Sequence, residues 1–518
     1  MEENLLTVFT TSNLILAALG VYLVVIVILG LIYARKIHDQ DDLVVAGRQL
    51  NIFFLVPSII ATWICAGAMM GAAGWAYLYG MQGVIFDPWA PALGMVLVAF
   101  FFAYRMRKAK YLTVTDFFDT RYGTRMGFLY TIIQILSAMA WQAGQLVALG
   151  IIVSLTTGFS LSFAIVIATV AIIIVTTTGG LWALSRVDAI GFVLIVLGLL
   201  MLFPTVMGEV GGISNFFATA QNWAELPTWA MTPVAGDQGY LWYTGILGIL
   251  LYISAWAALS LGDVQSQVLM QRALAAKDEK TAVAGFFASG VLYLILGLMP
   301  VMIGIAVFTW GLETTEAQAE FVLPWAAYTF LPDWAGALFI VTIAAAIVST
   351  AGNNSLVMAT LIGHNIYRHI KPEATSAEIL KITRIFVIVA TLITMAIGLY
   401  FEVIYKLIIF SGGIQLGTVF AAYAFGHFWK KANNTGAITS FFVGIVSWLS
   451  GYAYIHYAME VYAGDAIFMS LVPAAAISII TLIVVSLATQ KQDPPKPMLS
   501  FDGKNIEKEP MFFWSKKT

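Results

Sequence analysis

Apolar runs long enough to cross a membrane recur along the whole of this 518-residue chain. A helix needs about 20 apolar residues to span the hydrocarbon core of a bilayer. Hydrophobic residues make up 60% of the chain and charged residues only 10%, whereas soluble domains carry about 25% charged residues. The sequence therefore predicts an all-α polytopic membrane protein, and it offers no basic patch for binding nucleic acid.

Thirteen runs are predicted to span the membrane. The first lacks a basic leader and a cleavage site, so we interpret it as a span and not as a removable signal peptide. The approximate limits are 13–34, 50–80, 84–104, 127–153, 160–179, 187–208, 240–262, 282–308, 334–365, 382–400, 403–428, 435–457 and 467–488.

The distribution of Lys and Arg sets the orientation of these spans. Basic residues cluster after every second span, whereas the long loops 209–239 and 309–333 contain none. The positive-inside rule then predicts an outside N-terminus and a cytoplasmic C-terminus in the cell membrane. Residues 1–490 are expected to form one transmembrane domain, followed by an unstructured cytoplasmic tail at 491–518.

Two of the spans, the second and the seventh, have weakened middles. In the second, "ATWICAGAMMGAAG" (61–74) contains Gly67, Gly71 and Gly74. Such small residues allow close packing between helices, or they mark a break that frees backbone carbonyls to bind a cation. Interruptions in corresponding spans of two halves indicate an inverted-repeat transporter with a site at the membrane midplane.

The ninth span carries several polar side chains in "AAAIVSTAGNNSLVMATL" (344–361). Ala346, Ser349, Thr350 and Asn353 follow the spacing i, i+3, i+4, i+7 and share one helix face. Oxygen ligands without a carboxylate suit a weakly held monovalent cation better than magnesium or calcium. The alternative is that these side chains bond back to the preceding turn or to a neighbouring helix.

Further polar groups lie near span ends or on one face of a span. Asp188 stands at the start of the sixth span, where it is either solvated or paired with Arg186, or forms part of a functional site. The fourth span presents Ser137, Trp141 and Gln145 at i, i+4 and i+8 on one face. The stretch 261–277, in which the seventh span ends, contains Asp263, Gln265, Ser266, Gln267 and Gln271.

Several of these stretches, in their order along the chain, resemble motifs of the sodium:solute symporter family. The nearest similarity is to its high-affinity choline transporter branch, through "ATW" (61–63) and "AMAW" (138–141) among others. The motifs that carry the family resemblance are "AGRQL" (46–50), "YLTVTDFFDTRYG" (111–123), "GGLWALSRVDAIGF" (179–192), "QRALAAK" (271–277) and "STAGNNSLVMATLIGHNIY" (349–367).

The resemblance implies a LeuT-like core of five plus five inverted helices, with repeats at about 50–208 and 240–428. It implies a sodium-coupled symporter that imports a small organic solute by alternating access, and not an enzyme. Sodium would be the coupling ion and no other cofactor is implied. Transferred by motif, the family's shared sodium site falls on Ala61, Ile64, Ala346, Ser349 and Thr350.

The resemblance also suggests where the other ligands lie. Asp188 with Asn353 is the candidate for gating or for a second ion, although Gly352 and Asn353 replace the serines of some relatives. The solute is left open between an organic cation or zwitterion, a carboxylate or amino acid, and a sugar or nucleoside. A solute-binding membrane sensor and a channel are the alternatives. The residues expected to contact solute are Trp63, Trp141, Gln145, Gln265, Ser266 and Gln267.

Overall fold

The computed structural model describes residues 13–34, 40–220, 222–223, 226–311, 315–400, 404–507 and 509. Within these residues the helices are joined by loops, and the only strands form one antiparallel pair of two residues each, β1 (Asn222–Trp223) and β2 (Leu226–Pro227). The helices of the first half are α1 (Asn13–Ala34), α2 (Gln40–Val45), η1 (Ala46–Arg48), α3 (Ile52–Trp63), η2 (Gly67–Gly71), α4 (Ala72–Gly83), η3 (Ile85–Trp89), α5 (Ala90–Leu97), η4 (Val98–Phe102), α6 (Ala103–Ala109), α7 (Val114–Arg121), α8 (Thr124–Thr157), α9 (Leu161–Glu209) and α10 (Ile213–Thr219).

The second half contains the remaining helices. They are α11 (Gly245–Ser260), α12 (Gln267–Ala275), α13 (Glu279–Phe308), α14 (Glu316–Ala319), α15 (Val322–Phe330), α16 (Asp333–Thr360), η5 (Leu361–Tyr367), α17 (Arg368–Ile370), α18 (Ser376–Tyr400), α19 (Ile404–Thr418), α20 (Phe420–Phe428), α21 (Asn434–Ala453), η6 (Tyr454–Ala458), α22 (Ala463–Met469) and α23 (Leu471–Ala488).

The predicted spans correspond to helices of the structure. Nine helices of the described residues are long and apolar enough to cross a membrane, and two bent pairs pass the same test when each is taken together. Two shorter apolar helices, Leu161–Ile174 and Gly245–Ser260, fall on the fifth and seventh predicted spans. The all-α polytopic architecture predicted from the sequence is therefore confirmed.

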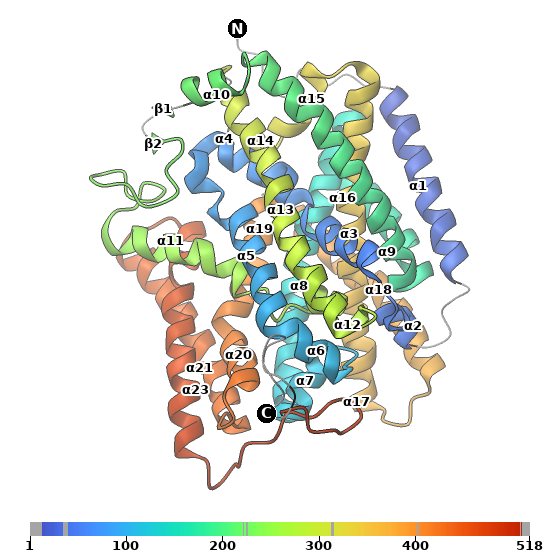
Figure 1. Cartoon of the computed structure of the whole chain (residues 1–518), viewed down its shortest axis with the longest axis vertical. Coiled ribbons are helices and arrows are strands. Elements are labelled where there is room, and N and C mark those ends of the chain that lie inside the picture. The colour runs from blue at the N-terminus through green and yellow to red at the C-terminus, as the bar shows by residue number, and fades with distance from the viewer. Residues whose placement is uncertain are drawn as a thin grey trace.

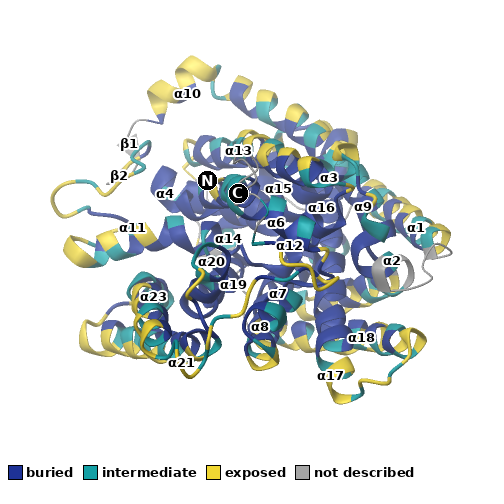
Figure 2. Ribbon diagram, turned by 60° about the horizontal axis from the view of Figure 1, so that its bottom comes forward, coloured by how far each residue is buried: buried dark blue, intermediate teal, exposed yellow. Residues whose placement is uncertain are grey.

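The helices form a buried centre surrounded by an apolar outer surface. α16 and α8 lie at the centre. In the spans that contain them, 94% and 89% of an apolar stretch of 18 residues is buried, against 22% in the peripheral α1. α1 lies at one edge and α21 with α23 at the opposite side (Figure 1). Outward faces of α1, α18 and α21 are exposed while the centre is buried (Figure 2). Such a surface, apolar where it is exposed, fits an integral protein bounded by lipid.

Both spans predicted to be weak are interrupted. α3 and the helix that resumes at Gly67 are bent by 56° at a break of three residues. In the seventh span the interruption occupies residues 261–266, between α11 and α12, and so lies at the end of the predicted span. A further break occurs inside α9 at Gly180, whose φ of 52° places it in the left-handed region that favours glycine.

The C-terminal tail differs from the expectation of an unstructured segment. Residues 491–507 contain no helix, but they pack along the end of the molecule formed by α6 and α7 (Figure 1). The amide of Phe501 donates to the carbonyl of Ala109 over 2.8 Å. The buried guanidinium of Arg121 donates to the carbonyl of Lys496. Side chains of the 110–127 segment therefore donate hydrogen bonds to the backbone of residues 491–507.

Candidate functional site

The break after α3 redirects backbone hydrogen bonds. In a continuous helix the amides of Cys65 and Ala66 would donate to the carbonyls of Ala61 and Thr62. Here the Cys65 amide donates to the carbonyl of Trp63 over 2.9 Å. The Ala66 amide donates to the side-chain oxygen of Gln145, in α8, over 3.2 Å. The carbonyls of Ala61 and Thr62 are therefore left without their helical donors.

Thr350 of α16 lies against these freed carbonyls. Its hydroxyl oxygen is 3.2 Å from the carbonyl oxygen of Ala61 and 3.1 Å from that of Thr62. It is also 3.0 Å from the carbonyl oxygen of Ala346 in its own helix. A hydroxyl has one proton to donate, so three carbonyl oxygens converge on a group that can satisfy only one at a time.

The neighbouring Ser349 belongs to a buried network around Asp188 of α9. The hydroxyl of Ser349 donates to Oδ1 of Asp188, and the amide of Asn353 donates to the same oxygen over 3.1 Å. Ser58 of α3 donates to Oδ2 over 2.5 Å. Asp188 is fully buried, so the solvated alternative raised from the sequence does not hold.

The cation that faces Asp188 is Arg272 of α12. Its Nη2 lies 3.8 Å from Oδ2 of Asp188, and both side chains are fully buried. The same nitrogen donates to the hydroxyl of Thr62 over 2.9 Å. Arg186, the partner considered from the sequence, packs instead over the rings of Phe54 and Trp182. The pair therefore joins α9, α12 and α3 while leaving no net charge.

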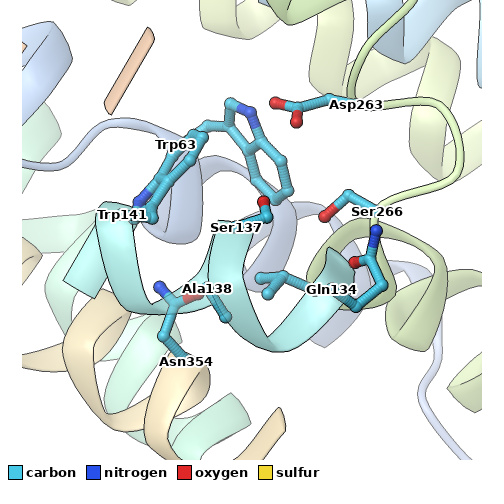
Figure 3. Close-up of a pocket in the computed structure, with 9 residues that line it drawn as sticks. Trp63, Gln134, Ser137, Ala138, Trp141, Asp263, Ser266 and Asn354 are labelled. Carbon is cyan, nitrogen blue, oxygen red and sulfur yellow. The ribbon is translucent and has the colours of Figure 1, made fainter. Parts of the chain in front are cut away.

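A small cavity lies between the two interrupted spans. It offers about 10 Å³ to solvent, which is room for about one water. The Trp63 and Trp141 rings meet edge to face, with centroids 5.5 Å apart, and Trp63 lies between Trp141 and Asp263 (Figure 3). The lining residues are Trp63, Gln134, Ser137, Ala138, Trp141, Asp263, Ser266, Val268 and Asn354.

Three of the residues predicted to contact solute line this cavity: Trp63, Trp141 and Ser266. The other three do not, and each is engaged elsewhere. Gln145 bonds to the backbone of the α3 break. Gln265 donates to the carbonyl of Gly262 over 2.5 Å, and Gln267 accepts from the amide of Val114 over 2.7 Å. Their role in solute binding stays a prediction.

Two buried acids near the site had no role assigned from the sequence. Asp263 lines the cavity, and its Oδ1 accepts from the amide of Gln415 over 3.3 Å. Asp87 of η3 accepts a hydrogen bond of 2.5 Å from Tyr293, whose hydroxyl also lies 3.3 Å from the carbonyl oxygen of Trp63. An acid inside a predicted span is a functional candidate by default, and that rule would have selected Asp87.

Several known proteins are similar to this chain in sequence or in structure. The chain is 24% identical to a high-affinity choline transporter 1 of Caenorhabditis elegans, over 92% of this chain and 85% of that one. It is 24% identical to a sodium/glucose cotransporter of Vibrio parahaemolyticus, over 83% and 82% of the two chains. The structure of a Na⁺-coupled sialic acid symporter in a substrate-bound outward-open state superposes with a TM-score of 0.74 at 18% identity, covering 95% of this chain and all of that one.

The interrupted helices and this superposition show that the chain has the LeuT-like fold. The profile of the sodium:solute symporter family matches residues 43–444. The chain belongs to the sodium:solute symporter family. The resemblance predicted from the sequence motifs is thereby confirmed, including its similarity to choline transporters.

Proposed function

We propose that the protein imports a small organic solute together with sodium, by alternating access across the cell membrane. Family membership supports this proposal, as do the transport activities named for the relatives. In the proposed arrangement residues 1–490 form the transport domain, with repeats at about 50–208 and 240–428 and a cytoplasmic tail at 491–518. The N-terminus would lie outside the cell, as the distribution of Lys and Arg predicts.

The proposed sodium site uses the carbonyls of Ala61, Ile64 and Ala346 and the hydroxyls of Ser349 and Thr350. The observation that supports it best is the convergence of the carbonyls of Ala61, Thr62 and Ala346 on the Thr350 hydroxyl. A monovalent cation among these oxygens would satisfy the acceptors that one proton cannot. Ser349 donates its proton to Asp188, so the lone pairs of its oxygen are free to face the cation.

Sodium at this position would link the two halves of the molecule. Ala61 belongs to the first interrupted helix and Thr350 to α16, which is part of the second proposed repeat. The bound ion would hold the α3 break in one arrangement and so stabilise the adjoining cavity for solute. Because the cavity has room for about one water, solute entry requires the lining helices to move apart.

The proposal is tested by sodium-driven uptake into proteoliposomes of a radiolabelled solute selected by a thermal-shift screen. The double variant Ser349→Ala/Thr350→Ala removes both hydroxyl ligands. We expect it to raise the sodium concentration for half-maximal uptake about tenfold or more, because each tenfold change corresponds to about 1.4 kcal/mol of binding free energy. Solute binding without any uptake would instead identify a sensor.

Thr342→Ala is the matched control for this experiment. Thr342 lies in the same helix, α16, and its hydroxyl oxygen lies 3.0 Å from the carbonyl oxygen of Leu338 and 3.2 Å from that of Leu194. The variant therefore removes a buried hydroxyl of the same helix away from the proposed site, and its sodium dependence should match the wild type. An unchanged sodium dependence in the double variant would show that the site is misassigned.

A further inference from the structure

Asp263 is a buried acid that faces the cavity without a cation. Its side chain is 2% exposed, and its Oδ2 has no hydrogen-bond partner among the described residues. No residue that lines the cavity in the described part of the chain is Lys, Arg or His. An isolated ionised carboxylate is very costly to bury, so this position requires a positive partner whenever Asp263 is charged.

The local backbone fixes Asp263 in this position. It lies in the non-helical segment between α11 and α12, where the amide of Ser266 donates to its carbonyl over 2.9 Å. The preceding Gly262 leaves no room for a side chain, because an added Cβ would lie 2.0 Å from the carbonyl oxygen of Ala258 and 2.3 Å from that of Gly412. The turn that carries Asp263 is thus packed closely between α11 and α19.

Comparison with Asp188 shows what Asp263 lacks. Both acids are buried next to the α3 break, but Asp188 has the guanidinium of Arg272 at 3.8 Å and three further donors. Among the described residues Asp263 has only neutral donors, the amide of Gln415 at 3.3 Å and the side chain of Trp63. Among the described residues Arg272 is engaged with Asp188 and Thr62. Among the described residues the carboxyl group of Asp188 thus faces a cation, whereas that of Asp263 faces only neutral donors.

The other lining groups narrow the chemistry of that ligand. The rings of Trp63 and Trp141 offer faces that attract organic cations. The indole nitrogen of Trp141 is buried, has no partner in the described part of the chain and can donate one hydrogen bond. A carboxylate binds best to a cation that carries N–H donors. The lining therefore offers one acid, two aromatic rings and several neutral polar groups, those of Gln134, Ser137, Ser266 and Asn354 and the indole nitrogen of Trp141.

We propose that the cavity binds a protonated amine whose ammonium group faces Asp263, and that Asp263 selects this class over neutral solutes, carboxylates and quaternary ammonium ions. The inference rests on the proposed solute transport and names its substrate class. A second acceptor-bearing group on the same molecule would take the hydrogen bond of Trp141. Uptake would then carry the charge of the solute in addition to that of sodium.

The test measures binding to the purified full-length protein by calorimetry at saturating sodium. Ethanolamine and benzylamine are each compared with the neutral alcohol, the trimethylammonium ion and the carboxylate of the same skeleton. These are ethylene glycol, choline and glycolate, and benzyl alcohol, benzyltrimethylammonium and benzoate. Within a series that binds, we expect the amine to have a higher affinity than the alcohol, the trimethylammonium ion and the carboxylate. Tighter binding of an alcohol, a carboxylate or a trimethylammonium ion, or no binding of either amine, would overturn the inference.

Asp263→Asn is the accompanying variant, and it should weaken amine binding about tenfold or more, as expected when a charged hydrogen-bond partner is removed. Asp465→Asn is its matched control, since Asp465 accepts from Tyr243 over 2.8 Å and lies in α22 outside the cavity. Unchanged amine affinity in Asp263→Asn would contradict the assignment. If the variant changes only the sodium affinity, Asp263 serves a coupling ion and the inference is wrong.

The same preparation separates this inference from the proposed sodium coupling. A sodium titration without solute reports the sodium site, whereas the order of affinities within each ligand series reports the charge preference. If amines bind best but sodium has no effect, the proposed coupling fails and the assignment of Asp263 stands. If sodium binds and a neutral or anionic ligand is preferred, the assignment of Asp263 fails and the proposed sodium coupling stands. If Asp263→Asn does not fold, the wild-type series still decides the matter.

Discussion

The hydroxyl of Thr350 lies 3.2 Å from the carbonyl oxygen of Ala61, across 289 residues of sequence. The carbonyl has lost its helical donor because the Cys65 amide bonds to Trp63. The hydroxyl in turn faces more carbonyls than it can satisfy. This single contact joins the interruption of α3 to the polar stretch of α16, and the proposed coupling between sodium and solute depends on it.

The glycines that follow the break are predicted to act through packing. A Cβ added at Gly74 would lie 2.7 Å from the backbone of Ala319 and 2.9 Å from the amide of Glu320. Gly74→Ala should therefore lower the free energy of unfolding by about 1–3 kcal/mol through overpacking. Gly20→Ala in α1, where nothing lies within 4 Å of the added atom, should be neutral or slightly stabilising. Thermal unfolding in detergent measures both, and equal effects would contradict the prediction.

Loss of Arg272 should destabilise the protein strongly. Arg272→Met leaves the carboxylate of Asp188 buried without its cation, which typically costs about 3–5 kcal/mol. The double variant Asp188→Asn/Arg272→Met should recover part of this loss, since the unpaired charge is gone. The exposed pair of Lys110 and Asp502, 3.2 Å apart, is the control. Lys110→Met should change stability by less than about 1 kcal/mol, and a similar loss in both pairs would refute the role of burial.

Asp119 in α7 should make stability depend on pH. Burial, reinforced by the nearby Asp116, raises the pKa of Asp119 from its ordinary 3.8 to about 7. The folded chain thus holds this proton more tightly than the unfolded chain, so stability present below about pH 4 is lost as the pH rises through about 7.

The variant Asp119→Asn removes this titration. It should unfold at the same temperature as the wild type near pH 4 and at a higher temperature near pH 8, because the amide stays neutral throughout. Asp502→Asn at the exposed pair should show no such divergence. A difference between Asp119→Asn and the wild type that is constant with pH would exclude titration of Asp119 as its cause.

Hydropathy predicted most of the fold because a membrane span must satisfy its backbone internally. The positions of the helix breaks were harder to predict from the sequence. Gly67, Gly71 and Gly74 suggested a weak helix, yet the interruption lies at residues 64–66, just before them. The second interruption depends on the contact of Gly262 with Gly412. Such contacts between distant segments leave no local pattern in a sequence.

The candidate site could be predicted only in part, because some of its contacts join residues that are distant in the sequence. Spacing and family motifs selected Ser349 and Thr350, which share one helix face, and their sodium role stays a prediction. The partner of Asp188 could not be found locally, since Arg186 is closer in sequence but Arg272 faces the carboxylate. Asp263 was visible as a polar residue of its stretch. Only the structure shows that Asp263 lines the cavity, and that the nearby Gln265 and Gln267 do not.

The most direct measurement is a sodium titration of the purified protein, read by thermal unfolding, for the wild type, Thr350→Ser and Thr350→Ala, with potassium as the reference ion. Ligand binding to the folded state raises its stability according to its affinity. We predict that Thr350→Ser, which keeps the hydroxyl, stays within about threefold of the wild-type affinity, and that Thr350→Ala weakens it about tenfold or more. A Thr350→Ala protein that responds to sodium as the wild type does would contradict the proposed site.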